Sequence, residues 1–505
     1  MTLAGAVGAA APPAPAWCSR HRNDAIWCGC AAALAVVVFW LAHAGLGDDG
    51  YITLDYARTL AVHGTWGLTS QLQSNTATSP LNVLLLAMVM AGCRIVAGGP
   101  HPVAALGVVT VAALTATAWW LIRITHALRI PASGRALGIA VLLLSPLALS
   151  AIGLETALLV ALLLGLVSEA IRARPLMFGL LAGLALLTRL DAVVFVVVLG
   201  LGSATVRRRW WRALAPMLLV TVPWFVWSWT VLGSAIPDTL AIKQLQVYPG
   251  GWSFAGGLVL FLRDSFWPAI VSLLPAALGL LALLAWLVAR SAGRVSNRLA
   301  PAALFAVAGV GYFGAYCALA VPPYLWYYVP TLAALDAFFV VALARFVRHR
   351  PAGMSLGLVL ALAPLVTDLL HGLPWHAPPI FGNYAEPADY ARVGEQMRPM
   401  LAGAAVESPG ELGTLVFYCH CEVTDQFSDP GRALPFIEAQ TRAAAPTLRW
   451  ALALNYHRLD RCVRPVPVRY HLVWGPGWVR QRPGVWDVSS PASGKGHLTL
   501  YPVAG

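Results

Sequence analysis

The sequence predicts a polytopic α-helical membrane protein, with 11–13 transmembrane helices and a C-terminal α/β domain outside the cytoplasm. Three features of the 505-residue chain indicate this class: 59% of the residues are hydrophobic, only 11% are charged, and the mean hydropathy is +0.70. Soluble domains contain about 25% charged residues, so this chain could not cover its apolar surface with polar groups in water. The composition therefore excludes a soluble enzyme, a disordered chain, a collagen-like fibre and a disulfide-stapled secreted module.

The expected transmembrane region, residues 26–370, contains twelve apolar segments. A span needs about 20 mostly apolar residues. The first segment follows Arg20 and Arg22, and no small-residue cleavage site follows it, which indicates an uncleaved span rather than a signal peptide. Residues 1–25 are rich in alanine and proline and are expected to form a disordered cytoplasmic N-terminus. The twelve segments are 26–46, 79–98, 102–122, 136–152, 157–171, 176–188, 190–206, 213–233, 268–289, 299–320, 324–345 and 352–370.

Arginine clusters between these segments predict the topology. The formal net charge is +12, and it is mostly arginine. Positive residues stay in the cytoplasm, which assigns clusters 207–212, 290–298 and 345–350 to that side. The N-terminus is then cytoplasmic and the chain after residue 371 external, which requires an odd number of crossings. One of the twelve segments is therefore wrong, and we expect the error between 79 and 206. Because topology accounts for the positive charge, the expected partner is a lipid bilayer and not nucleic acid.

The composition changes at about residue 371, where the sequence becomes rich in Pro, Arg and Glu. Residues 371–505 are numerous enough to bury a core of their own. Short runs at Thr414–Tyr418 and Leu498–Tyr501 have β character, and Trp450–Tyr456 continues a helical pattern. These features predict a small external α/β domain.

The three cysteines of this external segment suggest one disulfide. In an oxidising compartment, we expect Cys462 to pair with Cys419 or with Cys421. The Cys-His-Cys run at 419–421 is too tightly spaced for an ordinary zinc site.

Two adjacent carboxylates, Asp48 and Asp49, stand where the first span leaves the bilayer. Such neighbours raise one another's pKa, which favours a catalytic base or a metal ligand. Interfacial acids are also often simply solvated, and this alternative stays open. Residues 55–61 have the spacing of a short interfacial helix, and the first external loop is expected at 47–78.

Few other charges lie within or beside the spans, so each is a candidate for function. An intramembrane cation with a nearby acid can also be a buried ion pair that holds helices together. The lone lysine of the membrane region can bind either a lipid surface or the phosphate of a ligand. The aromatic run at 324–328 can form a membrane-interface belt or a stacking surface. The charged candidates are Glu155, Arg189, Asp191, Asp238, Lys243, Asp336 and Asp368.

Five motifs in order resemble the GT-C membrane glycosyltransferases, and most of all the group around the mycobacterial terminal arabinofuranosyltransferase. Together with a similar external stretch from Gly413 to Asp425, the order holds from residue 48 to about residue 430, although Asn82 stands where the group has Trp and Asp238 where it has Asn. The motifs are Asp48-Asp49-Gly50-Tyr51-Ile52 with Tyr56-Ala57-Arg58, Thr78-Ser79-Pro80-Leu81, Gly153-Leu154-Glu155-Thr156, Thr188-Arg189-Leu190-Asp191, and Pro237-Asp238-Thr239 with Lys243.

The resemblance implies a GT-C fold in the bacterial inner membrane, a polyprenyl-phosphate sugar donor (best matched by D-arabinofuranose) and a cell-envelope glycan or glycoprotein acceptor. It implies that Asp49 is the base and Asp48 its partner. The donor phosphate would bind the cations, and the remaining residues would bind substrate. No cofactor is expected to be required, and a divalent cation (Mg, Mn or Ca) stays open. The cations are Arg189, Lys243 and Arg58, and the substrate-binding set is Glu155, Asp191, Asp238, Tyr51 and Tyr327.

Three alternatives remain at this stage. The same fold could transfer mannose, another hexose or an aminosugar, including to protein. A transporter or flippase of polyprenyl-linked lipids is the main rival class, although the sequence lacks the repeated halves typical of transporters. A non-catalytic membrane scaffold is the third, and it would tolerate loss of the Asp49 carboxylate.

Overall fold

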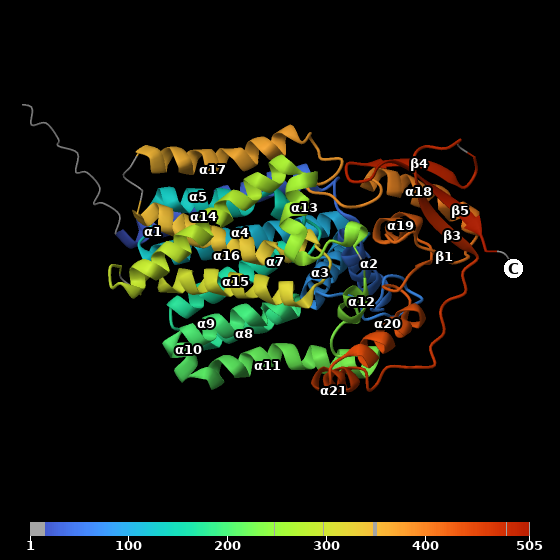
Figure 1. Ribbon diagram of the computed structural model, residues 1–505, viewed down its shortest axis with the longest axis horizontal. Coiled ribbons are helices and arrows are strands. Elements are labelled where there is room, and N and C mark those ends of the chain that lie inside the picture. Colours follow the sequence, from blue (N-terminus) through green and yellow to red (C-terminus); the bar gives the residue numbers. More distant parts are fainter. Residues whose placement is uncertain (1–15, 247, 296, 347–350, 481, 504–505) are drawn as a thin grey trace, which may run out of the picture.

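The computed structural model describes residues 16–246, 248–295, 297–346, 351–480 and 482–503. A bundle of long helices makes up most of the molecule, and a smaller domain covers one end of it (Figure 1). The bundle helices are α1 (Ala16–Ala42), α4 (Pro102–Leu128), α5 (Ala132–Leu143), α7 (Thr156–Ile171), α8 (Pro175–Thr188), α9 (Val193–Gly202), α11 (Trp210–Trp227), α14 (Phe266–Ser291), α15 (Ala300–Leu319), α16 (Val329–Phe346) and α17 (Pro351–Leu370).

Further helices connect the bundle helices. They are α2 (Asp48–His63), α3 (Pro80–Ala97), α6 (Pro146–Leu149), α10 (Ala204–Arg208), α12 (Thr239–Leu245) and α13 (Gly257–Asp264). Among the described residues, six helical stretches are long and apolar enough to cross a membrane, and five shorter helices are also apolar. The prediction of a polytopic helical membrane protein is confirmed.

Helix α3 differs from the predicted span 79–98. Its length and apolarity would allow it to cross, but both of its ends lie near the domain end of the bundle. The Arg94 guanidinium near its end donates a hydrogen bond to the carbonyl of Ala61, at the end of α2. Four residues after α3, α4 starts beside the external end of α1, since Gly107 lies against Phe39. At the far end of α4, His126 lies 2.8 Å from Asp24, near the start of α1.

Without α3, eleven bundle helices remain among the described residues, and the arginine clusters predict an odd number of crossings. Helices α2 and α3 pack against each other near the domain end of the bundle (Figure 1). The sequence could not distinguish these cases, because an apolar helix can face lipid or protein whether it crosses the bilayer or lies at its surface.

The structure describes only part of the segment 1–25, which the sequence predicts to be disordered. Residues 1–15 lie outside the described residues. Helix α1 begins at Ala16, so residues 16–25 belong to a helix, contrary to the prediction.

Small residues let the bundle helices approach closely. A Cβ atom on Gly179 of α8 would stand 1.9 Å from the carbonyl oxygen of Ala213 on α11, and one on Gly279 of α14 would stand 2.3 Å from the carbonyl oxygen of Leu335 on α16. Both would clash with backbone that cannot move aside. Close backbone approach at small residues is the usual source of helix association in lipid, where apolar burial gives little driving force.

The smaller domain, which the sequence predicts to be external, contains four helices and a five-stranded mixed sheet among its described residues. The strand order is β2-β1-β3-β5-β4. Strand β1 is parallel to β2 and β3, whereas β3, β5 and β4 form an antiparallel meander in which Trp474 pairs with Leu498. The elements are α18 (Pro387–Leu401), β1 (Val406–Glu407), α19 (Gly413–Cys419), β2 (Val423–Thr424), α20 (Pro430–Ala443), α21 (Pro446–Asn455), β3 (Tyr470–Pro476), β4 (Val485–Ser490) and β5 (Gly494–Pro502).

Two of the three local predictions in this domain are confirmed. Leu498–Tyr501 lies in β5, and most of Trp450–Tyr456 lies in α21. Thr414–Tyr418 is helical and not a strand, because it forms α19. Three backbone N–H groups at the start of α19 are satisfied by Asp48, which is 364 residues or more away in the chain. A local sequence pattern cannot predict a helix cap that comes from so distant a residue.

The predicted disulfide partners were wrong. Cys419 pairs with Cys421, and Cys462 is a free, exposed thiol. The sequence contained no information on which of the three thiols would meet.

Candidate functional site

A cavity of about 410 Å³ lies where the bundle meets the external domain. Its walls come from the first turn of α2, the loop before α3, the turn at 150–155, helix α12, the aromatic run at 324–326, and two segments of the domain. Five residues singled out in the sequence line it: Asp48, Asp49, Glu155, Lys243 and Tyr324.

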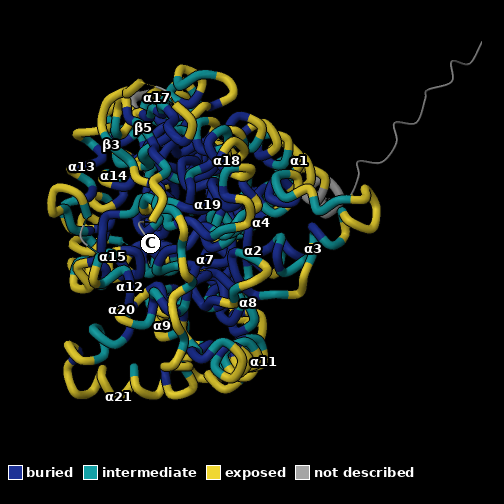
Figure 2. The backbone as a smooth tube through the Cα atoms, turned by 90° about the vertical axis from the view of Figure 1, so that its right-hand side faces the viewer, coloured by how far each residue is buried: buried dark blue, intermediate teal, exposed yellow. Residues whose placement is uncertain are grey.

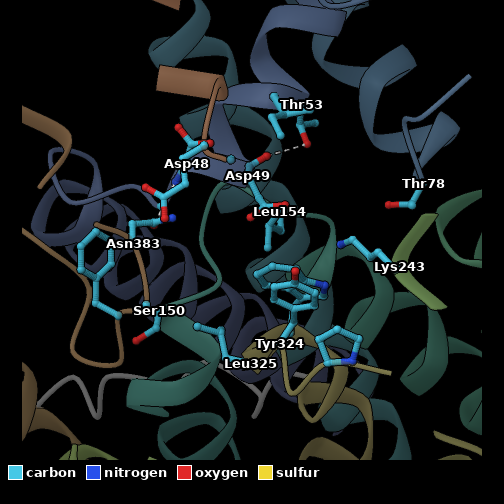
Figure 3. A pocket seen from close by; sticks show the side chains of 18 of the residues that line it. Asp48, Asp49, Thr53, Thr78, Ser150, Leu154, Lys243, Tyr324, Leu325 and Asn383 are labelled. Atoms are coloured by element: carbon cyan, nitrogen blue, oxygen red, sulfur yellow. Dashed lines mark hydrogen bonds between the residues drawn. The ribbon is translucent and has the colours of Figure 1, made fainter. Parts of the chain in front are cut away.

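Asp49 directs its side chain into this cavity from the first turn of α2 (Figure 3). Among the described residues, no residue other than Asp49 itself donates a hydrogen bond to this carboxylate, and the Thr53 hydroxyl donates to the backbone carbonyl of Asp49. Burial raises the pKa of Asp49 to about 6, and the negative charges of Asp48 and Glu155 add to this, while Lys243 opposes it. An unpartnered carboxylate with this pKa is suited to accept a proton near neutral pH.

Asp48 has a different environment from its neighbour. Its Oδ1 accepts a hydrogen bond from the Thr414 amide at 2.7 Å, and its Oδ2 accepts bonds from the Leu412 and Gly413 amides at 3.0 Å each. These are the free N–H groups at the start of α19, where a negative charge is stabilising. Asp48 therefore joins α2 to the external domain, and its oxygens are already engaged.

Lys243 reaches the cavity from α12, where its ammonium stands over an aromatic platform. Its Nζ lies 4.4 Å from the ring centre of Tyr324 and 5.0 Å from that of Trp326. These two rings stack on each other at 4.7 Å with an interplanar angle of 8°. No carboxylate lies within 4 Å of this ammonium among the described residues, so its charge is free to meet an anionic ligand. The aromatic run thus lines the cavity, and is not simply a belt facing lipid.

Arg189 lies outside the cavity lining, in a cluster of charged and tyrosine side chains. Its guanidinium lies 2.7 Å from Glu155 and 2.6 Å from Asp191, and it donates a further bond to the hydroxyl of Tyr316. Tyr312 also donates to Asp191, at 3.1 Å. Two acids surround one cation, which matches the buried ion pair that the sequence analysis gave as an alternative to ligand binding. Arg189 itself does not line the cavity. Only Glu155 connects the cluster to the cavity wall.

Tyr327 lies between the two predicted phosphate-binding cations. Its ring centre is 5.0 Å from the Arg189 guanidinium and 5.7 Å from the Lys243 ammonium. It is buried and does not line the cavity, so it supports the platform from beneath.

Three further residues expected to bind substrate or phosphate also lie outside the cavity lining. Tyr51 packs its ring on Phe417 and Tyr418 of α19. Arg58 pairs with Asp55 at 2.6 Å and donates to the Phe417 carbonyl.

Asp238 is the third. It is buried at the start of α12 and accepts a hydrogen bond from the Ser234 hydroxyl at 2.8 Å. Burial raises the pKa of Asp238 to about 7, and the Ser234 bond opposes that rise. The side chains of all three residues are engaged by contacts within the protein.

Three polar residues that sequence reasoning missed also line the cavity. They are Asp264, Asn383 and Glu411. Glu411 accepts hydrogen bonds from the Tyr384 amide and the Tyr390 hydroxyl, and burial raises its pKa to about 8. Each stands in a loop or at a helix end without periodicity, and no local signal marks it. Within the described residues, no group of three His, Cys, Asp or Glu side chains could hold a metal ion.

Solved structures share this architecture. ArnT from Cupriavidus metallidurans, solved bound to undecaprenyl phosphate, matches with a TM-score of 0.56 and 15% identity over 94% of this chain and 98% of that one. The oligosaccharyltransferase of Archaeoglobus fulgidus matches with a TM-score of 0.54 and 12% identity over 88% of this chain and 69% of that one. The arabinofuranosyltransferase AftD from Mycobacteria matches with a TM-score of 0.54 and 15% identity, over 94% of this chain and 40% of AftD.

No protein-family model matches the sequence, and no curated protein matches it. The likeness is therefore one of fold, and it extends over nearly the whole length of this chain and of ArnT. The three matched proteins are GT-C glycosyltransferases. The chain has the GT-C fold of polytopic membrane glycosyltransferases, with the cavity between its helical bundle and its external domain.

Proposed function

We propose that the protein is a glycosyltransferase that moves a sugar from a polyprenyl-phosphate donor to a hydroxyl of a cell-envelope glycan or glycoprotein, on the external face of the bacterial inner membrane. One observation carries this proposal. A carboxylate without a partner, Asp49, and a cation without a carboxylate partner, Lys243, line one cavity at the junction of bundle and domain.

The two groups suit the two ends of a sugar transfer. Asp49 takes the proton of the acceptor hydroxyl while that oxygen forms a bond to the anomeric carbon. The bond from the anomeric carbon to the phosphate oxygen breaks, and the phosphate leaves with the electron pair. Lys243 stabilises the charge that develops on this leaving group. A polyprenyl phosphate is a fair leaving group, so the step needs no nucleotide, and the proposal requires no metal ion.

A lipid-linked donor fits the position of the cavity. Its walls include loops that join bundle helices at the domain end, at 150–155 and 322–326. A polyprenyl tail would lie in the bilayer beside these loops, with the phosphate at the interface. The ArnT structure with the same fold was solved with undecaprenyl phosphate, which supports this class of donor.

For the sugar, D-arabinofuranose is the first candidate. The order of the motifs from Asp48 to Lys243 resembles the arabinofuranosyltransferase group, and AftD has the same fold. Mannose, other hexoses and aminosugars, with glycan or protein acceptors, remain the alternatives within this fold.

The test is a transfer assay on purified protein in lipid nanodiscs, with a panel of polyprenyl-phosphate sugars that includes phospho-arabinose and phospho-mannose. We expect one donor to support transfer and Asp49→Asn to lower the rate by about 10²–10⁴-fold, the usual contribution of a general base. Asp460→Asn makes the same chemical change at an exposed position of the domain, and it should leave the rate unchanged. Wild-type activity in Asp49→Asn, or no transfer from any donor in the panel, would overturn the proposal.

A further inference from the structure

Helix α21 presents an apolar face that no part of the described chain covers. Trp450 is 70% exposed and Leu454 is 52% exposed, and the helix contains no buried residue. The two side chains are four positions apart and therefore share one face. Leu452 stands about 160° away from both around the helix, on the basis of 3.6 residues per turn.

The opposite face holds α21 in place. Leu452 packs against a cluster formed by α12 and α20, whose buried members include Ile242 and Ile437. The exposed tryptophan and leucine are thus directed away from the domain. Their exposure is a consequence of how the helix is seated.

Helix α21 is bonded to the external end of α11, which continues to Leu232. The Trp229 indole donates a hydrogen bond to the Leu454 carbonyl at 3.1 Å, and the Asn455 side chain accepts one from the Ile236 amide at 2.8 Å. This contact sets the height of α21 relative to the bilayer, because α11 is one of the helices that cross it.

The surface of α11 beside this contact faces lipid. Of the six long apolar stretches, the one that includes α11 is the least buried, and its exposed side chains include Leu219, Val222 and Val226. The apolar face of α21 therefore adjoins a lipid-facing surface at the level where that surface leaves the membrane.

The direction of α21 fits the plane of a membrane. Viewed along the bundle, α11 is seen nearly end-on, while α21 runs across the view at the edge of the molecule (Figure 2). In the perpendicular view it lies beside the domain end of α11 (Figure 1). A helix that has this orientation, with a tryptophan and a leucine on its outer face, is the form that lies in the headgroup region.

Basic residues flank the helix. Arg458 stands 5.3 Å from the Trp229 ring, and Arg449 donates to backbone carbonyls of residues 442 and 444. Neither guanidinium has a carboxylate within 4 Å among the described residues. The two guanidinium groups complement the anionic headgroups of a bilayer surface. The binding free energy at such a surface is about 1 kcal/mol per basic residue.

We propose that α21 is an in-plane membrane anchor: Trp450 and Leu454 insert into the outer leaflet beside α11, and the arginines contact headgroups. The anchor ties this side of the external domain to the bilayer surface. It is independent of sugar transfer, because it rests on the surface of α21 and not on the cavity.

Fluorescence quenching in the membrane tests the proposal on the full chain. The six cysteines outside the Cys419–Cys421 disulfide are replaced by alanine, and Trp450→Cys or Leu454→Cys then carries an NBD label in proteoliposomes of phosphatidylcholine and phosphatidylglycerol. We expect both labels to emit at blue-shifted wavelengths and to lose most of their emission to phosphatidylcholine with a doxyl group at carbon 5. A doxyl group at carbon 12 should quench less, since such helices lie about 5–10 Å deep.

Two matched controls define the face and the helix. Leu448→Cys stands about 160° around the helix from Trp450, and Trp478→Cys replaces an exposed tryptophan of the domain after β3. Neither label should be quenched. Water-like emission without quenching at both 450 and 454 would overturn the proposal. Blue-shifted emission that no doxyl lipid quenches would also overturn it, because the face would then be covered by protein, such as a second copy of the chain.

Discussion

Asp48 and Asp49 are neighbours in the chain, but their side chains have different surroundings. Successive helical residues are rotated by about 100°, so one carboxylate meets the amides at the start of α19 and the other meets the cavity. The three amide bonds occupy the oxygens of Asp48, which leaves Asp49 as the free carboxylate of the pair. The difference between them is thus one of partners and not of residue type.

Transfer should depend on the protonation of Asp49. Its pKa is raised to about 6, mainly by burial, and only the ionised form can accept a proton. We expect the rate constant to be full above pH 7 and to fall about tenfold per pH unit well below pH 6. A pH–rate profile at saturating donor, between pH 4.5 and 8, measures this.

The residual rate of Asp49→Asn should be flat across the same range, which separates this group from Glu411 and Asp238. A wild-type rate that is constant from pH 5 to pH 8 would contradict the assignment of Asp49 as the base.

Lys243 should act on the donor more than on the acceptor. Its ammonium has aromatic neighbours but no carboxylate, so a phosphate would supply its first anionic partner. Loss of one charge-assisted hydrogen bond costs about 1.5–3 kcal/mol, so Lys243→Ala should raise the donor Kd by about 10–150-fold. Titration of the polyprenyl-phosphate sugar into protein in nanodiscs measures this Kd.

Lys243→Arg keeps the charge and the cation–π contacts and should recover part of the affinity. An unchanged donor Kd in Lys243→Ala would show that the phosphate binds elsewhere.

At the scale of elements, α2 and α19 form the joint between bundle and domain. The Tyr51 ring packs on Phe417 at 5.1 Å, Arg58 donates to the Phe417 carbonyl, and Asp48 caps the helix. A Cβ atom on Gly413 would stand 2.2 Å from the Asp48 carbonyl oxygen, so only glycine allows this approach. Two residues expected to bind substrate, Tyr51 and Arg58, contribute to this joint.

Asp48→Ala should loosen the joint without unfolding the bundle. It leaves three buried amides of α19 without an acceptor, and one buried unsatisfied polar group costs about 1–3 kcal/mol. We expect faster amide hydrogen exchange across residues 412–419 and a lower Tm. Hydrogen exchange with mass spectrometry measures the first effect directly.

Asp49→Asn is the matched control, because the Asp49 carboxylate contacts no part of α19. If residues 412–419 exchange at the wild-type rate in Asp48→Ala, the capping role is wrong.

At the scale of the molecule, the position of α3 decides which side each later loop faces. With α3 outside the membrane, the turn between α3 and α4 lies on the same side as the external domain. With α3 as a span, that turn would lie in the cytoplasm. Eleven crossings agree with the arginine clusters, and twelve do not.

Labelling of single cysteines in intact cells tests this topology. A membrane-impermeant maleimide should label Gly99→Cys and the native Cys462, which is exposed on the domain. Ser291→Cys, at the cytoplasmic end of α14, should react only after the membrane is permeabilised. Protection of Gly99→Cys in intact cells would restore α3 as a span.

Composition and motif order determined the class of this protein. The low content of charge makes lipid its main solvent, and the arginine clusters assign the sides of the loops, because both effects sum over many residues and need no contact between distant ones. Because charged residues are so few in the membrane region, Asp49, Glu155 and Lys243 stood out in the sequence as candidates, and all three line the cavity.

The tertiary structure alone decided which of these residues are free to act. Asp48, Arg58, Tyr51 and Asp238 carry the same chemical groups as a binding site, but contacts from segments far away in the chain engage them. Arg189 is likewise neutralised, by Asp191 two residues away and by Glu155 from the preceding turn at 150–155. A polar group can bind a ligand only if the fold leaves it without a partner, and partners that are hundreds of residues apart are brought together by packing.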